Sequence, residues 1–405
     1  MADALSILTS IAIVLLAGLL ITLLANKLKI SNVLLLIFAG ILFRALVFDG
    51  KPIFEFSPTF LIAISILALV MITFDGSSRF KFKEVDQFSG DAFKLFLWFI
   101  FLNIILLTIF TSVLFFQDFS MHHIIVSLIF AVLMAATDPG AIFSMMKGKI
   151  SRAIEVLEIE AIINTPFIVI IPFIILDFLS ATTDTKIFQS FIEQIVPFLT
   201  QIIVGVGAGV VIGIIIFKTL KKAYHHDLSP LAIIVAALLS YILAENLGGN
   251  GVLAVATMGL LFGNVYVKEK FTLQEFSSMF SSSLEILVFI LIGFIVKLEF
   301  TPGFLYKSLI LFAILVLARW FAVTFALRKK NYTIGEKIFI TFNMPKGIAV
   351  AAVVFTLSVQ PISGLETIIN LVLVFMIYSL ILSTVVDTFA QKLIRVKVEE
   401  KQVSV

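Results

Sequence analysis

The sequence predicts an all-α polytopic membrane protein of about thirteen transmembrane helices, arranged as inverted repeats with two crossed discontinuous helices. Three observations support this fold class. Of the 405 residues, 60% are hydrophobic and 14% are charged, and the mean hydropathy is +1.16, whereas a soluble domain carries about 25% charged residues. Basic residues collect on alternate loops, and two apolar stretches are interrupted by proline and glycine.

The sequence contains about thirteen apolar stretches that we interpret as membrane spans, since a helix needs about 20 mostly apolar residues to cross the hydrocarbon core. Four of them, the second, eighth, ninth and tenth, are short, and we expect these to tilt little or to recruit loop residues. The expected spans are 4–25, 33–48, 58–75, 93–116, 122–146, 153–176, 192–217, 229–244, 250–263, 283–297, 304–327, 336–357 and 365–388.

The basic residues predict the orientation. Of 29 lysines and arginines, 22 fall on one side of this arrangement and three lie within spans. The remaining four are on the other side, namely Lys51, Lys186, Lys297 and Lys307. Positive charge stays on the cytoplasmic face, so we expect a multi-pass protein of the cell membrane with its N-terminus outside and its C-terminus in the cytoplasm.

The composition argues against an enzyme. The sequence has no cysteine, no pair of histidines within a span, no HExxH motif and no glycine-rich phosphate loop before a helix. We therefore expect no cofactor and no permanently bound metal. The net charge of +3 follows from the membrane topology, and it does not indicate a nucleic-acid partner. The run Gly248–Gly251 is expected to be the turn into the ninth span.

The fifth span contains Thr137-Asp138-Pro139-Gly140, about 13 Å from its basic end. Proline removes a backbone hydrogen bond and glycine weakens the helix further. Carbonyls freed at that depth must be buried in protein or line an aqueous cavity. A carboxylate beside them indicates a cation site. The alternative, given equal weight, is that Asp138 only caps the broken helix.

The twelfth span contains Asn343-Met344-Pro345-Lys346-Gly347 at a similar depth. Because the fifth and twelfth spans cross in opposite directions, two such breaks are the sequence sign of an inverted-repeat secondary transporter. We expect one transmembrane domain over 1–388. It would comprise a first repeat at about 4–180, a linking helix at about 192–217 and a second repeat at about 229–388, before a short basic cytoplasmic tail, 389–405.

The sixth span carries the polar stretch EIEAIINTPF, residues 158–167. Glu160 and Asn164 are one helical turn apart and therefore share a face. A lone intramembrane glutamate would be neutral, so we expect an ion pair with Lys346 or Arg319. Thr165 can offer a hydroxyl and a carbonyl to a cation. Lys346 is expected to be a fixed counter-charge, with a proton-carrying role as the alternative.

The polar motifs described above resemble motifs of a known protein family. AATDPGAIF (135–143), EIEAIINTP (158–166) and FNMPKGIAVAAV (342–353) resemble signatures of the monovalent cation:proton antiporter superfamily, in its sodium/proton exchanger, NhaP-like branch. Similar segments occur in family order along nearly the whole chain. The resemblance implies a thirteen-helix fold of the NhaA/NhaP type, usually a homodimer. It also implies exchange of a monovalent cation, sodium first with lithium or potassium as alternatives, for protons by alternating access.

The resemblance implies an ion and proton site at Thr137, Asp138, Glu160, Asn164 and Thr165, with Lys346 and Arg319 compensating charge. The chain departs from the family at one important position, because the ion-binding aspartate that follows the asparagine is replaced by Thr165. Two other functions therefore stay open, a cation facilitator or channel uncoupled from protons and a sensor that does not transport. With threonine at 165, the resemblance leaves Glu160 or Asp138 to carry the competition between cation and proton.

Overall fold

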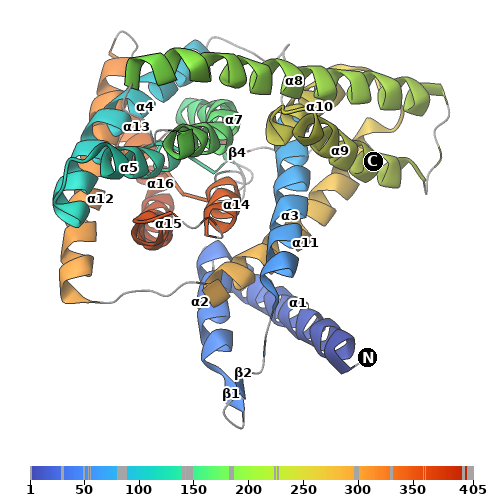
Figure 1. Cartoon of the computed structure of the whole chain (residues 1–405), viewed down its shortest axis with the longest axis horizontal. Helices are drawn as coiled ribbons and strands as arrows, with labels where there is room; N and C mark the ends of the chain where they lie inside the picture. Colours follow the sequence, from blue (N-terminus) through green and yellow to red (C-terminus); the bar gives the residue numbers. More distant parts are fainter. Residues whose placement is uncertain are drawn as a thin grey trace.

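The computed structural model describes residues 2–28, 32–48, 51–52, 54, 56–79, 89–138, 142, 149–181, 187–222, 225, 228–295, 301–328, 332–358, 360, 362–394 and 397–398. Nearly all of them are helical (Figure 1). Eight helices within these ranges are long and apolar enough to cross a membrane, and three shorter apolar helices accompany them. The predicted fold class, an all-α polytopic membrane protein, is confirmed.

Each of the thirteen expected spans has a helical counterpart among the described residues. The first half of the chain comprises α1 (Ala2–Leu28), α2 (Asn32–Ala45), α3 (Pro58–Ser78), α4 (Ser89–Thr111) with a π-helical turn η2 (Ser112–Phe116), α5 (Met121–Leu133), α7 (Arg152–Ala181) and α8 (Ile187–Lys222). The second half comprises α9 (Leu228–Asn246), α10 (Gly251–Asn264), α11 (Lys270–Ile295), α12 (Pro302–Ala326), α13 (Ile334–Phe342), α14 (Ile348–Leu357), α15 (Leu365–Thr388) and α16 (Ala390–Leu393).

Two short antiparallel pairings tie loops together. Strand β1 (Val47–Phe48) pairs with β2 (Lys51–Pro52) after α2, and β3 (Lys149–Ile150) pairs with β4 (Lys397–Val398). The second pairing joins the segment just before α7 to the C-terminal tail, so the two lie on the same side of the helical bundle.

The start of the tenth span was predicted wrongly. Helix α11 begins at Lys270 rather than at 283, because its serine-rich first half is too polar to register as an apolar stretch. Those serines are used inside the protein. Ser281 donates to the carbonyl of Met71 on α3 at 3.0 Å, and Ser278 accepts from Arg79 at 2.8 Å. The first half of α11 is therefore held in the protein by hydrogen bonds that its serine side chains form with neighbouring residues, and not by a run of apolar residues.

The helices form two groups that α8 bridges (Figure 1). Helices α4, α5, α7, α12, α13 and α15 pack together on the left of the view, while α1, α2, α3, α9, α10 and α11 pack together on the right and below. Helix α14 lies between the groups, since it contacts α7 and α15 as well as α3 and α11. The non-helical residues 343–347, which connect α13 to α14, therefore lie where the two groups of helices meet.

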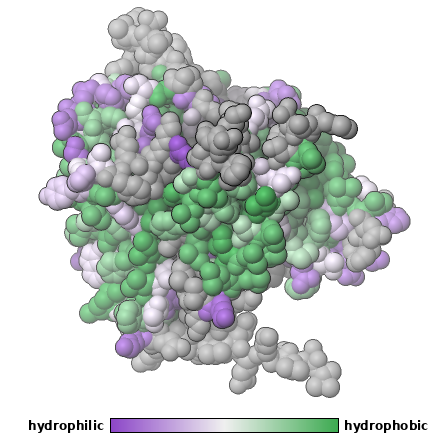
Figure 2. Space-filling view, turned by 90° about the horizontal axis from the view of Figure 1, so that it is seen from below, coloured by the Kyte–Doolittle hydropathy of each residue, from purple (hydrophilic) through white to green (hydrophobic). Residues whose placement is uncertain are grey.

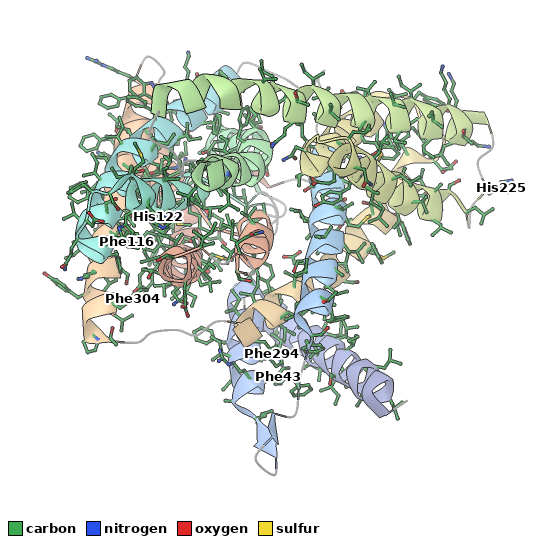
Figure 3. All side chains as sticks on the ribbon, viewed as in Figure 1. Phe43, Phe116, His122, His225, Phe294 and Phe304 are labelled. Carbon is green, nitrogen blue, oxygen red and sulfur yellow. The ribbon has the colours of Figure 1, made fainter. Side chains whose placement is uncertain are left out.

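Close helix packing in the second group depends on glycine. A Cβ on Gly40 of α2 would lie 2.0 Å from the carbonyl oxygen of Ile290, and one on Gly293 of α11 would lie 2.4 Å from that of Ile37. Helix pairs in membranes approach closely through such small residues. The rings of Phe43 and Phe294 lie beside this crossing (Figure 3).

The outer surface of the bundle is apolar, as a lipid-facing protein requires. Leu16, Leu20 and Leu23 of α1 expose more than half of their surface. Figure 2 shows hydrophobic residues gathered across the middle of one face, with hydrophilic residues towards its edges. This is the distribution expected for a protein whose middle zone contacts hydrocarbon.

Candidate functional site

Helix α5 ends at Leu133, five residues before Asp138. The N–H groups of Ala135 and Ala136 donate three residues back, to Val132 and Leu133, at 3.0 and 3.2 Å, and residues 136–138 are non-helical. The sequence explains why Asp138 is non-helical, because a residue that precedes proline is disfavoured in the α conformation. Pro139 and Gly140, which were predicted to break the helix, lie outside the described residues. Residues 129–138 are all buried.

The second break has a similar local origin. Helix α13 starts with a capping box between Thr333 and Glu336 and ends at Phe342. It is followed by the C-cap residue Asn343, whose φ and ψ are −95° and 80°. Residues 343–347 are non-helical, and α14 begins at Ile348. Pro345 lies in the middle of the break, where it cannot donate a backbone hydrogen bond. The described residues therefore include the end of helix α5 before Asp138 and, between α13 and α14, the second helix break that the sequence predicted.

The two breaks lie directly against each other. The N–H of Asp138 donates to the carbonyl of Pro345 at 2.9 Å. The ammonium of Lys346 donates to the carbonyl of Ala136, and its own backbone N–H donates to the hydroxyl of Ser379 on α15 at 3.1 Å. A Cβ on Gly347 would lie 1.8 Å from a carboxylate oxygen of Asp138. The crossed arrangement predicted from the sequence is confirmed.

Charges at this crossing complement the broken helices. The C-terminal end of a helix carries partial negative charge and its N-terminal end partial positive charge. Lys346 reaches the carbonyl of Ala136, just past the C-terminal end of α5. Asp138 packs on Gly347, just before the N-terminal end of α14. Each buried charge therefore lies beside the helix end of opposite sign.

Helix α7 brings Glu160 and Asn164 to the crossing. The guanidinium of Arg319 on α12 donates two hydrogen bonds to Glu160, each 2.6 Å, and both side chains are 0% exposed. Of the two predicted partners of Glu160, the structure selects Arg319. Asn164 donates from Nδ2 to the carbonyl of Ala135 at 3.4 Å, which places α7 against the first break.

Several buried polar atoms around the crossing have no hydrogen-bond partner within the described part of the chain. They are Oγ1 of Thr137, Oδ1 of Asn164, and both Oδ1 and Nδ2 of Asn343. Buried polar groups are normally paired, so an unpartnered group of this kind indicates a site that another species can enter. The three oxygens are hard ligands suited to a monovalent cation, as in transporters that use unwound helices. The side chain of Thr165 lies outside the described residues.

Phe99 of α4 lies against both buried cations of this region. Its ring centroid is 4.5 Å from Cζ of Arg319 and 5.5 Å from Nζ of Lys346. Sequence reasoning missed this residue, because one phenylalanine among 43 carries no distinguishing signal. Sequence reasoning also missed Ser379, which accepts the backbone hydrogen bond of Lys346. A hydroxyl side chain inside an apolar span could have identified this residue as a candidate.

A separate polar cluster caps the opposite end of α5. His123 bonds through Nδ1 to the carboxylate of Asp118 at 2.8 Å and stacks on Phe116, while His122 bonds to the carbonyl of Ser363 at 2.9 Å. Phe116 and His122 are labelled in Figure 3. Hydrogen bonds from Ser120, followed by that from His123, hold the pKa of Asp118 below its ordinary value. The carboxylate of Asp118 is therefore ionised at neutral pH, and the contribution of its hydrogen bonds to stability is lost as the pH falls through that lowered pKa.

Comparisons with known proteins agree with this arrangement. The family described as sodium/hydrogen exchanger, transmembrane, matches residues 11–390. A probable Na(+)/H(+) antiporter 2 from Methanocaldococcus jannaschii is 28% identical over 363 residues, which cover 84% of this chain and 82% of the relative. A K(+)/H(+) antiporter, NhaP2, from Shewanella baltica is 25% identical over 94% of this chain, and the chain spans 65% of the length of that relative.

A solved structure has the same fold. The sodium proton antiporter MjNhaP1 from Methanocaldococcus jannaschii, determined at pH 8, superposes with a TM-score of 0.78 at 20% sequence identity. The superposition covers 97% of this chain and 99% of that one. At this identity the likeness concerns the fold, and it extends over the whole set of helices described above.

Proposed function

The chain belongs to the sodium/hydrogen exchanger family, and from that premise we propose that it exchanges a monovalent cation for protons across a membrane by alternating access. Sodium is the first candidate, and potassium is the alternative because the similar Shewanella protein is named for K⁺. The observation that supports the proposal most strongly is the contact between the two breaks, where Asp138 and Pro345 are joined by a backbone hydrogen bond.

The proposed cation site lies between this crossing and α7. It comprises the side chain of Asp138, the unpartnered oxygens of Thr137 and Asn164, and Thr165, the next residue of the same helix. Asp138 is the acid for which cation and proton compete. Glu160 serves a different purpose in this proposal, since both of its oxygens are bound by Arg319 and a carboxylate so occupied is a poor ligand for a mobile ion.

Alternating access follows from the position of the crossing between the two groups of helices. The group that carries α5, α7, α13 and α15 would shift against the group that carries α1–α3 and α9–α11, with α8 as the connection. The two repeats, at about 4–180 and 229–388, would exchange roles between the outward-open and inward-open states. We further propose an N-terminus outside, a cytoplasmic tail at 389–405 and a homodimer, as the charge pattern and the family resemblance imply.

Proteoliposomes that contain the purified protein and a pH-sensitive dye test the proposed function. Addition of Na⁺ or K⁺ to one side should dissipate an imposed proton gradient with the wild-type protein. The variant Thr165→Asp is expected to lower the cation concentration for half-maximal exchange by about tenfold, as one additional pairing of about 1.4 kcal/mol would.

Thr165→Ser, which keeps the hydroxyl, is the matched control and should behave as the wild type does. If cation flux without proton movement occurs in the wild type, and proton coupling arises only with Thr165→Asp, the native protein is an uncoupled facilitator. If neither protein moves the cation, the exchange proposal is wrong.

A further inference from the structure

Two positive charges are buried close to one aromatic ring at the centre of this protein. Arg319 and Lys346 are both 0% exposed, and so is Phe99. The guanidinium carbon of Arg319 is 4.5 Å and the ammonium nitrogen of Lys346 is 5.5 Å from the ring centroid of Phe99. The three residues come from α12, from the second break and from α4.

The nearby carboxylate of Glu160 is hydrogen-bonded to only one of these two charges. Glu160 binds Arg319 through both oxygens, whereas Lys346 donates from its ammonium to the neutral carbonyl of Ala136. Among the described residues, this carbonyl is the only hydrogen-bond acceptor of the Lys346 ammonium, and an ammonium buried with so few acceptors is expensive to desolvate. The face of an aromatic ring is negative, and its attraction for a cation within about 6 Å is largest where water is excluded.

We propose that Phe99 is a positioning residue that holds the Lys346 ammonium at the first break and thereby couples the crossing to the Glu160–Arg319 pair. This inference rests on the proposed exchange function. The ring lies near one cation from the crossing, Lys346, and one from the ion pair on α7 and α12, Arg319, so the crossing and the ion pair keep a fixed relative position. Loss of the ring's negative face would release Lys346 from Ala136 and misplace Asp138, which packs on the next residue, Gly347.

A series of fluorinated phenylalanines at position 99 tests this role. Each added fluorine withdraws electron density from the ring face while the volume of the side chain changes little, so a residue that only fills space would be insensitive to the series. We expect the initial rate of cation-driven proton flux to fall stepwise from Phe to trifluoro-Phe, by about tenfold in total.

The same series at Phe130 is the control. Phe130 is a fully buried ring of α5 that packs edge-on against Phe375, with centroids 5.1 Å apart. Its fluorination should leave the flux unchanged. Equal rates across the series at position 99, with an active wild type, would overturn the role of Phe99 and leave the exchange function standing.

Thermal unfolding in detergent gives a readout that does not depend on transport. In a double-mutant cycle, Phe99→Leu should lower Tm by more in the protein that carries Lys346 than in the Lys346→Met background, whatever shift Lys346→Met causes by itself. Additive shifts would contradict a direct interaction between the ring and the ammonium. Because this cycle is measured even if the wild type moves no cation, failure of the proposed function and failure of this inference can be told apart.

Discussion

Replacement of Glu160 by glutamine is expected to lower the free energy of unfolding by about 3–5 kcal/mol, because removal of one partner of a buried ion pair leaves the other uncompensated. Arg319 is 0% exposed and its guanidinium donates both of its short bonds to Glu160. The variant would leave a full positive charge in the protein interior with a neutral amide beside it. Thermal and denaturant unfolding of the purified protein in detergent measure the loss.

A double variant separates this structural role from a role in ion binding. Replacement of a buried ion pair by apolar residues of similar volume is often neutral, so Glu160→Met combined with Arg319→Met should recover most of the lost stability. We expect the recovered protein to retain cation-driven proton flux at a reduced rate, because Asp138 is intact while Phe99 has lost its contact with Arg319. If the double variant is as stable as the wild type but inactive, Glu160 itself takes part in exchange. An unchanged Tm for Glu160→Gln would contradict the account of the pair.

Replacement of Gly347 by alanine should reduce exchange by about a hundredfold, which is the scale of effect that a displacement of about 1 Å has on a positioned group. The added methyl carbon would lie 1.8 Å from Oδ2 and 2.0 Å from Cγ of Asp138. Such contacts require the carboxylate, or one of the two breaks, to move. Initial rates of proton flux in proteoliposomes, at equal amounts of reconstituted protein, give the comparison.

The matched control is Gly207→Ala in α8, where an added Cβ meets no atom within 4 Å. It should leave exchange at the wild-type rate, and alanine should slightly favour the helix. Wild-type activity in Gly347→Ala would show that Asp138 need not be held where the structure places it.

Much of this architecture could be predicted because membrane burial imposes strong patterns. The apolar stretches give the helices, and proline after Asp138 and within 343–347 gives the two breaks. Partners were harder to predict. The sequence allowed Glu160 to pair with either Lys346 or Arg319, and only the fold, which brings Arg319 of α12 within reach of Glu160 on α7, decides for Arg319.

Other features of the structure could not be predicted from a single sequence. The early start of α11 was missed because Ser278 and Ser281 look like loop residues until their partners on α3 are known. Phe99 was missed because its importance depends on which charges lie over its ring. Both depend on long-range contacts between helices, and local hydropathy carries no information about such contacts.

The most direct test of the central claim compares wild-type protein with Asp138→Asn in proteoliposomes that carry an imposed proton gradient. The asparagine keeps the size of the side chain and the backbone bond to Pro345 but cannot release a proton. We predict that Na⁺ or K⁺ dissipates the gradient with the wild type and fails to do so with Asp138→Asn at equal Tm. Exchange at the wild-type rate in the variant would contradict the assignment of Asp138 as the acid for which cation and proton compete.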